Sequence, residues 1–277
     1  MPLLYQFLPG IAASAGVAAA LLTLAILWKR LRWAGALAIG LGYASGHVAT
    51  AGIVRFPPTE ATHWLLPFSL AAMLVGVLDE AIHSPIWLRL GTWTLVFALS
   101  LFLLLRAKFQ YGWSPSEGAL WVASFAVGIV LLTCCYEKVS AKSPALALLI
   151  AATVAGGTGG ALIISGSLLL GQLAMVLTAT IAVGAIVAIW FPNVIWIRAF
   201  MPVISILLSS LWLSGWFYAE LPAISAALLA AASACGLVPL AKEMTMLKSL
   251  LVRTALAGVL VACAVGLAFH ASPPMDY

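Results

Sequence analysis

Long apolar segments, separated by short stretches that carry nearly all of the charge, are the feature of this sequence that most restricts its fold. Charged residues make up only 8% of the 277 residues, whereas 64% are hydrophobic. A soluble domain of this length has too little interior to bury that much apolar surface. The segments run for about 18–25 residues, the length that a helix needs to cross about 30 Å of hydrocarbon. Because helices also satisfy their own backbone hydrogen bonds in lipid, the sequence predicts an all-α integral membrane protein.

We predict a bundle of about ten transmembrane helices joined by short loops, forming a single polytopic membrane domain over residues 1–277. Prolines mark several of the breaks, as at Ser143-Pro144 and Leu221-Pro222. A 5+5 division near residue 140 would allow an inverted repeat, since an odd number of helices flips the second half. The predicted helices cover residues 8–28, 33–53, 62–82, 86–105, 119–136, 144–166, 168–191, 199–219, 222–240 and 250–269.

The distribution of Lys and Arg predicts which loops face the cytoplasm, because cytoplasmic loops are enriched in positive charge. With the N-terminus outside, the outer loops hold only Arg55, Arg106 and Lys108. The inner loops then hold Lys29, Arg30, Arg32, Arg89, Lys138, Lys142, Arg198, Lys242, Lys248 and Arg253. We therefore expect both termini outside, and we place the protein in a cell membrane. A bacterial cytoplasmic membrane is favoured by the economy of the chain and not by any targeting motif.

Several classes of function are disfavoured by the sequence. The net charge of +5 is dispersed among the membrane boundaries, so we expect no nucleic-acid partner. Four cysteines lie inside apolar segments without CxxC spacing and are expected to serve as small packing residues. The sequence contains no Walker loop, GxSxG motif or CxxCH motif. We therefore expect no cofactor and no nucleotide-driven pump on this chain alone.

The predicted third helix ends in charged residues that lie unusually close to the membrane. Its uncharged stretch, residues 64–78, would span only about 22 Å as a helix, which is less than the hydrocarbon thickness. Either the helix extends outward through Thr62 and His63, or Asp79 and Glu80 are drawn towards the membrane.

A polar cluster is therefore predicted at this point. Asp79 and His83 are spaced i,i+4 and share a helix face, and Arg89 can reach back to them across the hairpin. We interpret Asp79, Glu80, His83 and Arg89 as candidates for gating a path or relaying protons, since intramembrane ionisable groups are costly and usually functional. The alternative is that they mark helix ends, with arginines extending to the headgroups.

A second candidate site lies on the outer side. Glu60 and His63 are spaced i,i+3, and His47 and His270 would lie on the same side of the membrane, so these four residues are candidate ligands for zinc or iron. The signal is weak because no HExxH motif occurs. The alternative is a proline-stiffened loop in which Thr59 or Thr62 caps the next helix. His47 alone is more simply explained by a hydrogen bond across the bundle.

The third candidate is a glycine cluster at the middle of the predicted sixth helix, formed by Gly156, Gly157, Thr158, Gly159 and Gly160. Transporters use locally unwound helices at the membrane midplane to bind an ion or substrate. Alternatively, Gly156 and Gly160 form a GxxxG face that lets another helix approach closely.

These patterns favour a small secondary transporter or permease. One alternative is a non-catalytic membrane subunit or scaffold. The second alternative is a membrane-embedded enzyme with a His/Glu site on its outer face. The expected partners are the lipid bilayer, a small molecule or ion in the case of a transporter, and other membrane proteins in the case of a scaffold.

Overall fold

The computed structural model of the chain describes residues 2–28, 33–53, 56, 58, 60–82, 85–191, 199–239 and 245–271. Every regular element within these residues is helical, which confirms the predicted all-α membrane fold. The elements are α1 (Pro2–Leu27), α2 (Ala34–Ala51), η1 (Ala61–Trp64), α3 (Leu65–Ile82), α4 (Ile86–Leu104), α5 (Arg106–Tyr111), α6 (Pro115–Lys142), α7 (Pro144–Ile164), α8 (Leu168–Trp190), α9 (Met201–Tyr218), α10 (Ala223–Ser233), η3 (Ala234–Leu237) and α11 (Met246–Ala271).

Eight of the described helices, with η1 counted as part of α3, are long and apolar enough to cross a membrane. The other two predicted spans correspond to α2 and α10. Helix α2 carries Tyr43, Ser45 and His47 among its small residues and is not among the eight helices that are apolar enough to span. The predicted helix over residues 222–240 was too long. Helix α10 ends at Ser233 and continues only through the short 3-10 turn η3, so this apolar segment is Ala223–Leu237.

Helix α6 differs from its prediction in the opposite direction. It begins at Pro115, because the Ser114 hydroxyl accepts a hydrogen bond from the backbone N–H of Glu117 and caps the first turn. It ends only at Lys142, where the Ser143-Pro144 step starts α7. Residues 137–142, which the sequence placed in a loop, are therefore helical. The short helix α5 was not predicted.

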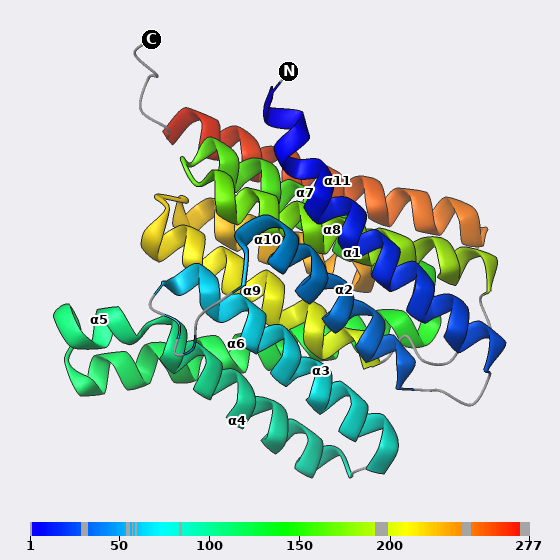
Figure 1. Ribbon diagram of the computed structural model, residues 1–277, viewed down its shortest axis with the longest axis horizontal. Coiled ribbons are helices and arrows are strands. Elements are labelled where there is room, and N and C mark those ends of the chain that lie inside the picture. Colours follow the sequence, from blue (N-terminus) through cyan, green and yellow to red (C-terminus); the bar gives the residue numbers. More distant parts are fainter. Residues whose placement is uncertain are drawn as a thin grey trace.

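Helix α9 occupies the centre of the bundle and contacts α2, α3, α4, α6, α7, α8 and α10. All of its residues from 201 to 215 are buried. It is also the most enclosed of the eight spanning helices. Figure 1 shows the helices running along one common direction, with α1 beginning and α11 ending towards the same side of the bundle. The central helix is thus the spanning helix that is most shielded from lipid.

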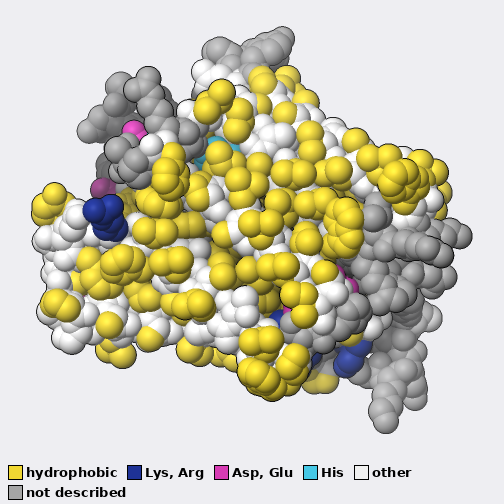
Figure 2. Space-filling view, turned by 60° about the horizontal axis from the view of Figure 1, so that its bottom comes forward, with side chains coloured by type: hydrophobic (Ala, Val, Ile, Leu, Met, Phe, Trp, Pro, Cys, Tyr) yellow, Lys and Arg dark blue, Asp and Glu magenta, His cyan; other side chains and the backbone are white. Residues whose placement is uncertain are grey.

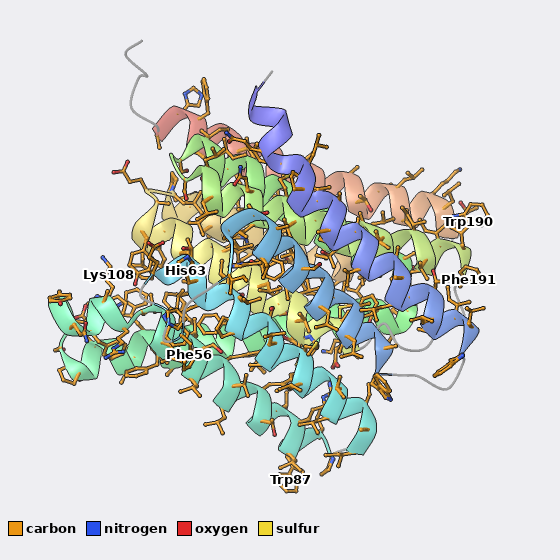
Figure 3. All side chains as sticks on the ribbon, viewed as in Figure 1. Phe56, His63, Trp87, Lys108, Trp190 and Phe191 are labelled. Carbon is orange, nitrogen blue, oxygen red and sulfur yellow. The ribbon has the colours of Figure 1, made fainter. Side chains whose placement is uncertain are left out.

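The surface of the bundle exposes many large apolar side chains. Large hydrophobic side chains such as Leu95, Leu99 and Val259 are exposed. Figure 2 shows yellow apolar side chains across most of the visible face, with the few dark blue and magenta side chains at its left edge and in its lower part. Figure 3 labels Lys108 and His63 at one end of the bundle and Trp190 and Phe191 at the opposite end. We refer to these as the Lys108 end and the Trp190 end.

Candidate functional site

Three charged side chains from three spanning helices meet in a buried ion-pair cluster, formed by Asp79 of α3, Arg89 of α4 and Glu137 of α6. The Arg89 Nε atom lies 3.2 Å from Asp79 Oδ2. Its other arm, through Nη2, donates a hydrogen bond to Glu137 Oε2. The side chains of Arg89, Asp79 and Glu137 are only 6%, 11% and 14% exposed. One guanidinium is therefore shared by two carboxylates inside the protein.

The α3–α4 hairpin brings these groups together. Helix α4 starts directly after Pro85, which has an extended backbone. The carbonyl oxygen of Pro85 accepts hydrogen bonds from the backbone N–H groups of Leu88 and Arg89. Arg89 is thus placed one turn inside α4. The guanidinium carbon lies 4.4 Å from the ring centroid of Trp93, which is fully buried one turn further along. Aromatic contact of this kind stabilises a cation and fixes the orientation of the guanidinium.

The charge balance of the cluster is uneven. When both carboxyls are ionised, the cluster carries one negative charge more than Arg89 compensates. Ions in a low-dielectric interior are costly unless they are paired, and removal of one partner leaves an uncompensated charge. Arg89 is therefore the cation that keeps both of these buried carboxylates paired among the described residues.

The contact predicted between Arg89 and Asp79 across the hairpin is present in the structure. Because Arg89 is buried, the alternative in which it extends to the headgroups is wrong for this residue. Glu80 follows Asp79 on α3 and is partly buried. His83 lies outside the described residues.

Glu137 is the residue that the sequence reasoning missed. It falls one position beyond the helix predicted over residues 119–136, so it was assigned to a loop. A signal was nevertheless present, because no proline or glycine interrupts residues 129–143 before Pro144. A helix that continues to that proline carries Glu137 on its last turns and inside the bundle.

His47 and Tyr43 form a second polar pair, on α2. Both residues are fully buried, and their ring centroids lie 5.9 Å apart. Neither ring nitrogen of His47, nor the Tyr43 hydroxyl, has a hydrogen-bond partner among the described residues. The predicted hydrogen bond from His47 across the bundle is therefore not made within them. The face of α2 that carries Tyr43 and His47 also carries Gly40, which packs against Met73 of α3.

The outer candidate metal site is not assembled in the described residues. Glu60 and His63 do come together, with His63 Nε2 lying 3.9 Å from Glu60 Oε2. However, no group of three or more His, Cys, Asp or Glu side chains within the described ranges could hold a metal ion. His270 lies in the last turn of α11. Thr62 lies inside η1 and does not cap it, and Thr59 lies outside the described residues.

The glycine cluster lies in an uninterrupted α-helix, so the interpretation of a locally unwound segment is wrong. Its glycines instead allow close contact with two neighbouring helices. A side chain on Gly157 would collide with Val261 of α11, and one on Gly159 would meet Met175 and the carbonyl oxygen of Gly171 on α8. Gly156 faces Thr178 of α8 at an ordinary contact distance, whereas Gly160 has nearly open space. Close packing of neighbouring helices is therefore present, but it is made by Gly157 and Gly159, and the predicted GxxxG face of Gly156 and Gly160 is wrong.

Thr158, at the centre of the glycine cluster, joins α7 to the central helix. Its hydroxyl donates to the carbonyl oxygen of Val154 and accepts a hydrogen bond from the indole N–H of Trp212. Trp212 is therefore a second residue that contacts a candidate site and that the sequence did not predict there.

The fold and these clusters define a polytopic all-α membrane protein with a buried ion-pair cluster between three of its helices. No protein-family model matches this sequence, and no curated protein matches it significantly.

Proposed function

We propose that this protein is a small secondary transporter, or permease, of a cell membrane, with both termini outside. The ion-pair cluster of Asp79, Arg89 and Glu137 is the observation that carries this proposal. Buried ionisable groups within membrane-spanning helices are expensive and usually mark the path of an ion or a proton. The Lys and Arg distribution in the sequence supports a position of this cluster on the cytoplasmic side.

The geometry of the cluster supports a switching role. Asp79 and Glu137 lie on different helices and compete for one guanidinium, so Arg89 can be held by α3, by α6 or by both. Binding of a proton or a cation at either carboxylate would weaken that side of the pairing. The relative stability of two helix arrangements would then depend on the bound ion, which is what coupling of ion binding to a conformational change requires.

Polar atoms deeper in the bundle support a path away from the cluster. Ser210 and Ser214 lie one turn apart on the central helix α9, and both hydroxyls are buried without a partner among the described residues. Helix α9 contacts α2. On α2, the Tyr43 hydroxyl and the His47 ring nitrogens are likewise buried without a hydrogen-bond partner among the described residues. Since buried polar groups are nearly always hydrogen-bonded, such a concentration favours contact with water or a solute at some stage.

The glycine cluster favours the scaffold alternative, because Gly157 and Gly159 allow neighbouring helices to pack closely and do not form an unwound segment that could bind a solute. The enzyme alternative rests on Glu60 and His63, which form a pair without a third His, Cys, Asp or Glu among the described residues. The test of the proposal begins with the proton and sodium.

The proposal is tested with purified protein in proteoliposomes that contain the pH indicator pyranine. A potassium gradient and valinomycin impose a membrane potential, with and without sodium and a mixture of amino acids and sugars outside. We expect protein-dependent uptake of protons or of a radiolabelled solute, lowered to the rate of empty vesicles by Asp79→Asn or Glu137→Gln. Glu60→Gln, which changes an exposed carboxylate, serves as the control and should retain the wild-type rate. Uptake equal to that of empty vesicles under all conditions would contradict the proposal.

A further inference from the structure

A lateral groove of about 480 Å³ lies between α6, α9 and α10. Its floor is formed by Ser209, Trp212 and Trp216 of the central helix. One wall is α6, with Leu131 among its residues, and the other is the alanine-rich face of α10. The groove has the size of a typical small-molecule site, and nearly all of its lining is apolar.

The groove exists because α10 is short and its side chains are small. The opposite face of α10 packs on α11, where the Ser225 hydroxyl donates a hydrogen bond to the carbonyl oxygen of Ala264 and Leu229 is fully buried. The face towards α6 carries only alanines, among them Ala223, Ala227 and Ala230. Methyl groups cannot fill the space between two larger helices, so the centre of the bundle is reached from the side here.

The groove opens to the membrane and not to water. Leu131, on its α6 wall, is 60% exposed, and Ala227, on its α10 wall, is also exposed. Both belong to apolar helices. The groove extends from Ala223 to Ala234, which corresponds to about 16 Å along a helix and to about half of the hydrocarbon thickness. Its length therefore matches the depth of one leaflet.

The end of the groove at Ala223 carries the features of a membrane interface. Trp216 lines the groove and stacks on Phe217, with ring centroids 4.6 Å apart. Trp121 packs edge-on against Trp216 at 5.9 Å. The Lys108 ammonium lies 5.7 Å from the Phe217 ring centroid. Tryptophans favour the headgroup level, and a lysine beside them attracts the phosphate of a lipid.

We propose that the groove binds one acyl chain of a phospholipid from the leaflet at the Lys108 end, with the lipid phosphate near Lys108. The chain would lie along Ala227 and Ala230 and contact the indole of Trp212, which is otherwise enclosed by protein. Bulk lipid is as apolar as the groove, so an acyl chain gains no hydrophobic free energy when it moves from the bilayer into the groove. Retention of the lipid therefore depends on close packing in the groove and on the charge of Lys108.

The first test counts the lipids bound to the full-length protein by native mass spectrometry after mild detergent extraction. We expect one retained phospholipid per wild-type chain. Ala227→Trp should remove it by filling the groove, whereas Ala231→Trp, at an exposed position of the same helix outside the groove, should not. Lys108→Gln should lower the retained fraction about fivefold, the effect of losing one lysine–lipid contact. Equal retention in wild type and Ala227→Trp would overturn the proposal.

A second measurement tests the groove without placing a larger side chain in it. Fluorescence of the protein is compared in nanodiscs of ordinary and chain-brominated phospholipid, and the contribution of one tryptophan is obtained by subtracting its Trp→Phe variant. Trp212 is 5% exposed and Trp87 is 70% exposed. With a chain in the groove, Trp212 should be quenched as strongly as Trp87. Quenching of Trp87 without quenching of Trp212 would contradict the proposal.

The same preparations distinguish the lipid from a second copy of the chain, since small residues on α10 could also receive another helix. Sedimentation should show the same oligomeric state for wild type and Ala227→Trp. A wild-type dimer that Ala227→Trp converts to a monomer would assign the groove to a second copy and overturn the lipid proposal.

Discussion

The indole N–H of Trp212 donates a hydrogen bond to the Thr158 hydroxyl over 2.8 Å, and this bond joins the central helix α9 to the glycine cluster of α7. Both residues are buried, so neither group could exchange its partner for water. We expect Thr158→Val to lower the free energy of unfolding by about 1–3 kcal/mol, because the indole N–H would be left unpaired.

Unfolding in mixed detergent micelles measures this effect. Thr153→Val is the matched control on the same helix, since the Thr153 hydroxyl bonds only to the carbonyl oxygen of Leu149 within α7. Equal losses for the two variants would show that the bond to Trp212 adds nothing to the stability.

Arg89 should be essential to stability as long as its two carboxylates are charged. Arg89→Gln removes the guanidinium that pairs with both Asp79 and Glu137, and we expect a loss of about 3–5 kcal/mol in the free energy of unfolding. Adding Asp79→Asn and Glu137→Gln to the same chain removes the uncompensated charges and should restore most of the loss. Unfolding of the single and triple variants measures this recovery. A triple variant no more stable than Arg89→Gln would be inconsistent with charge as the cause.

The glycine cluster should tolerate a methyl group at one position and not at another. Gly157→Ala would collide with Val261 and should lower the free energy of unfolding by about 1–3 kcal/mol. Gly160→Ala meets nothing closer than 3.9 Å and should be neutral or stabilising by up to about 1 kcal/mol, because alanine is the better helix former. Thermal or detergent unfolding of the two variants gives the comparison. If both behaved alike, close packing of α7 on α11 would not be the reason for Gly157.

Two tyrosines should respond oppositely to loss of the hydroxyl group. Tyr218 donates a hydrogen bond to the carbonyl oxygen of Leu104, and Tyr218→Phe should cost about 0.5–1.5 kcal/mol of the unfolding free energy. The Tyr43 hydroxyl is buried and has no partner among the described residues, so Tyr43→Phe should be neutral or stabilising. A destabilised Tyr43→Phe, measured in the same unfolding assay, would mean that this hydroxyl has a partner in the membrane.

The fold was largely predictable because the length and apolar character of the segments restrict a chain in lipid to spanning helices. The contact of Arg89 with Asp79 was also predictable, since a short third helix and a tight hairpin leave few alternatives. Glu137 was not, because a pairing between helices distant in sequence depends on how α4 and α6 pack. The glycine cluster allowed either an unwound segment or close packing, and only the neighbouring side chains of α8 and α11 decide between them.

Helix α10 illustrates a different limit. Its alanines and the following Pro239 fit either a full span or a shorter segment, and hydropathy alone does not distinguish these. The end of the α-helix at Ser233 depends on contacts of η3 with α6, α7 and α11. The groove beside it could therefore not be inferred from the sequence.

The enclosure of α9 has a consequence for the biosynthesis of the protein. Helices α1 to α8 precede it in the chain, and six of them, α2, α3, α4, α6, α7 and α8, pack directly on α9. These helices enter the membrane before their central neighbour has been translated, so they cannot complete their native contacts at that stage. Maturation of the bundle must therefore wait until the ribosome has nearly finished the chain, and nascent chains that stop before α9 should be substrates for membrane quality-control proteases.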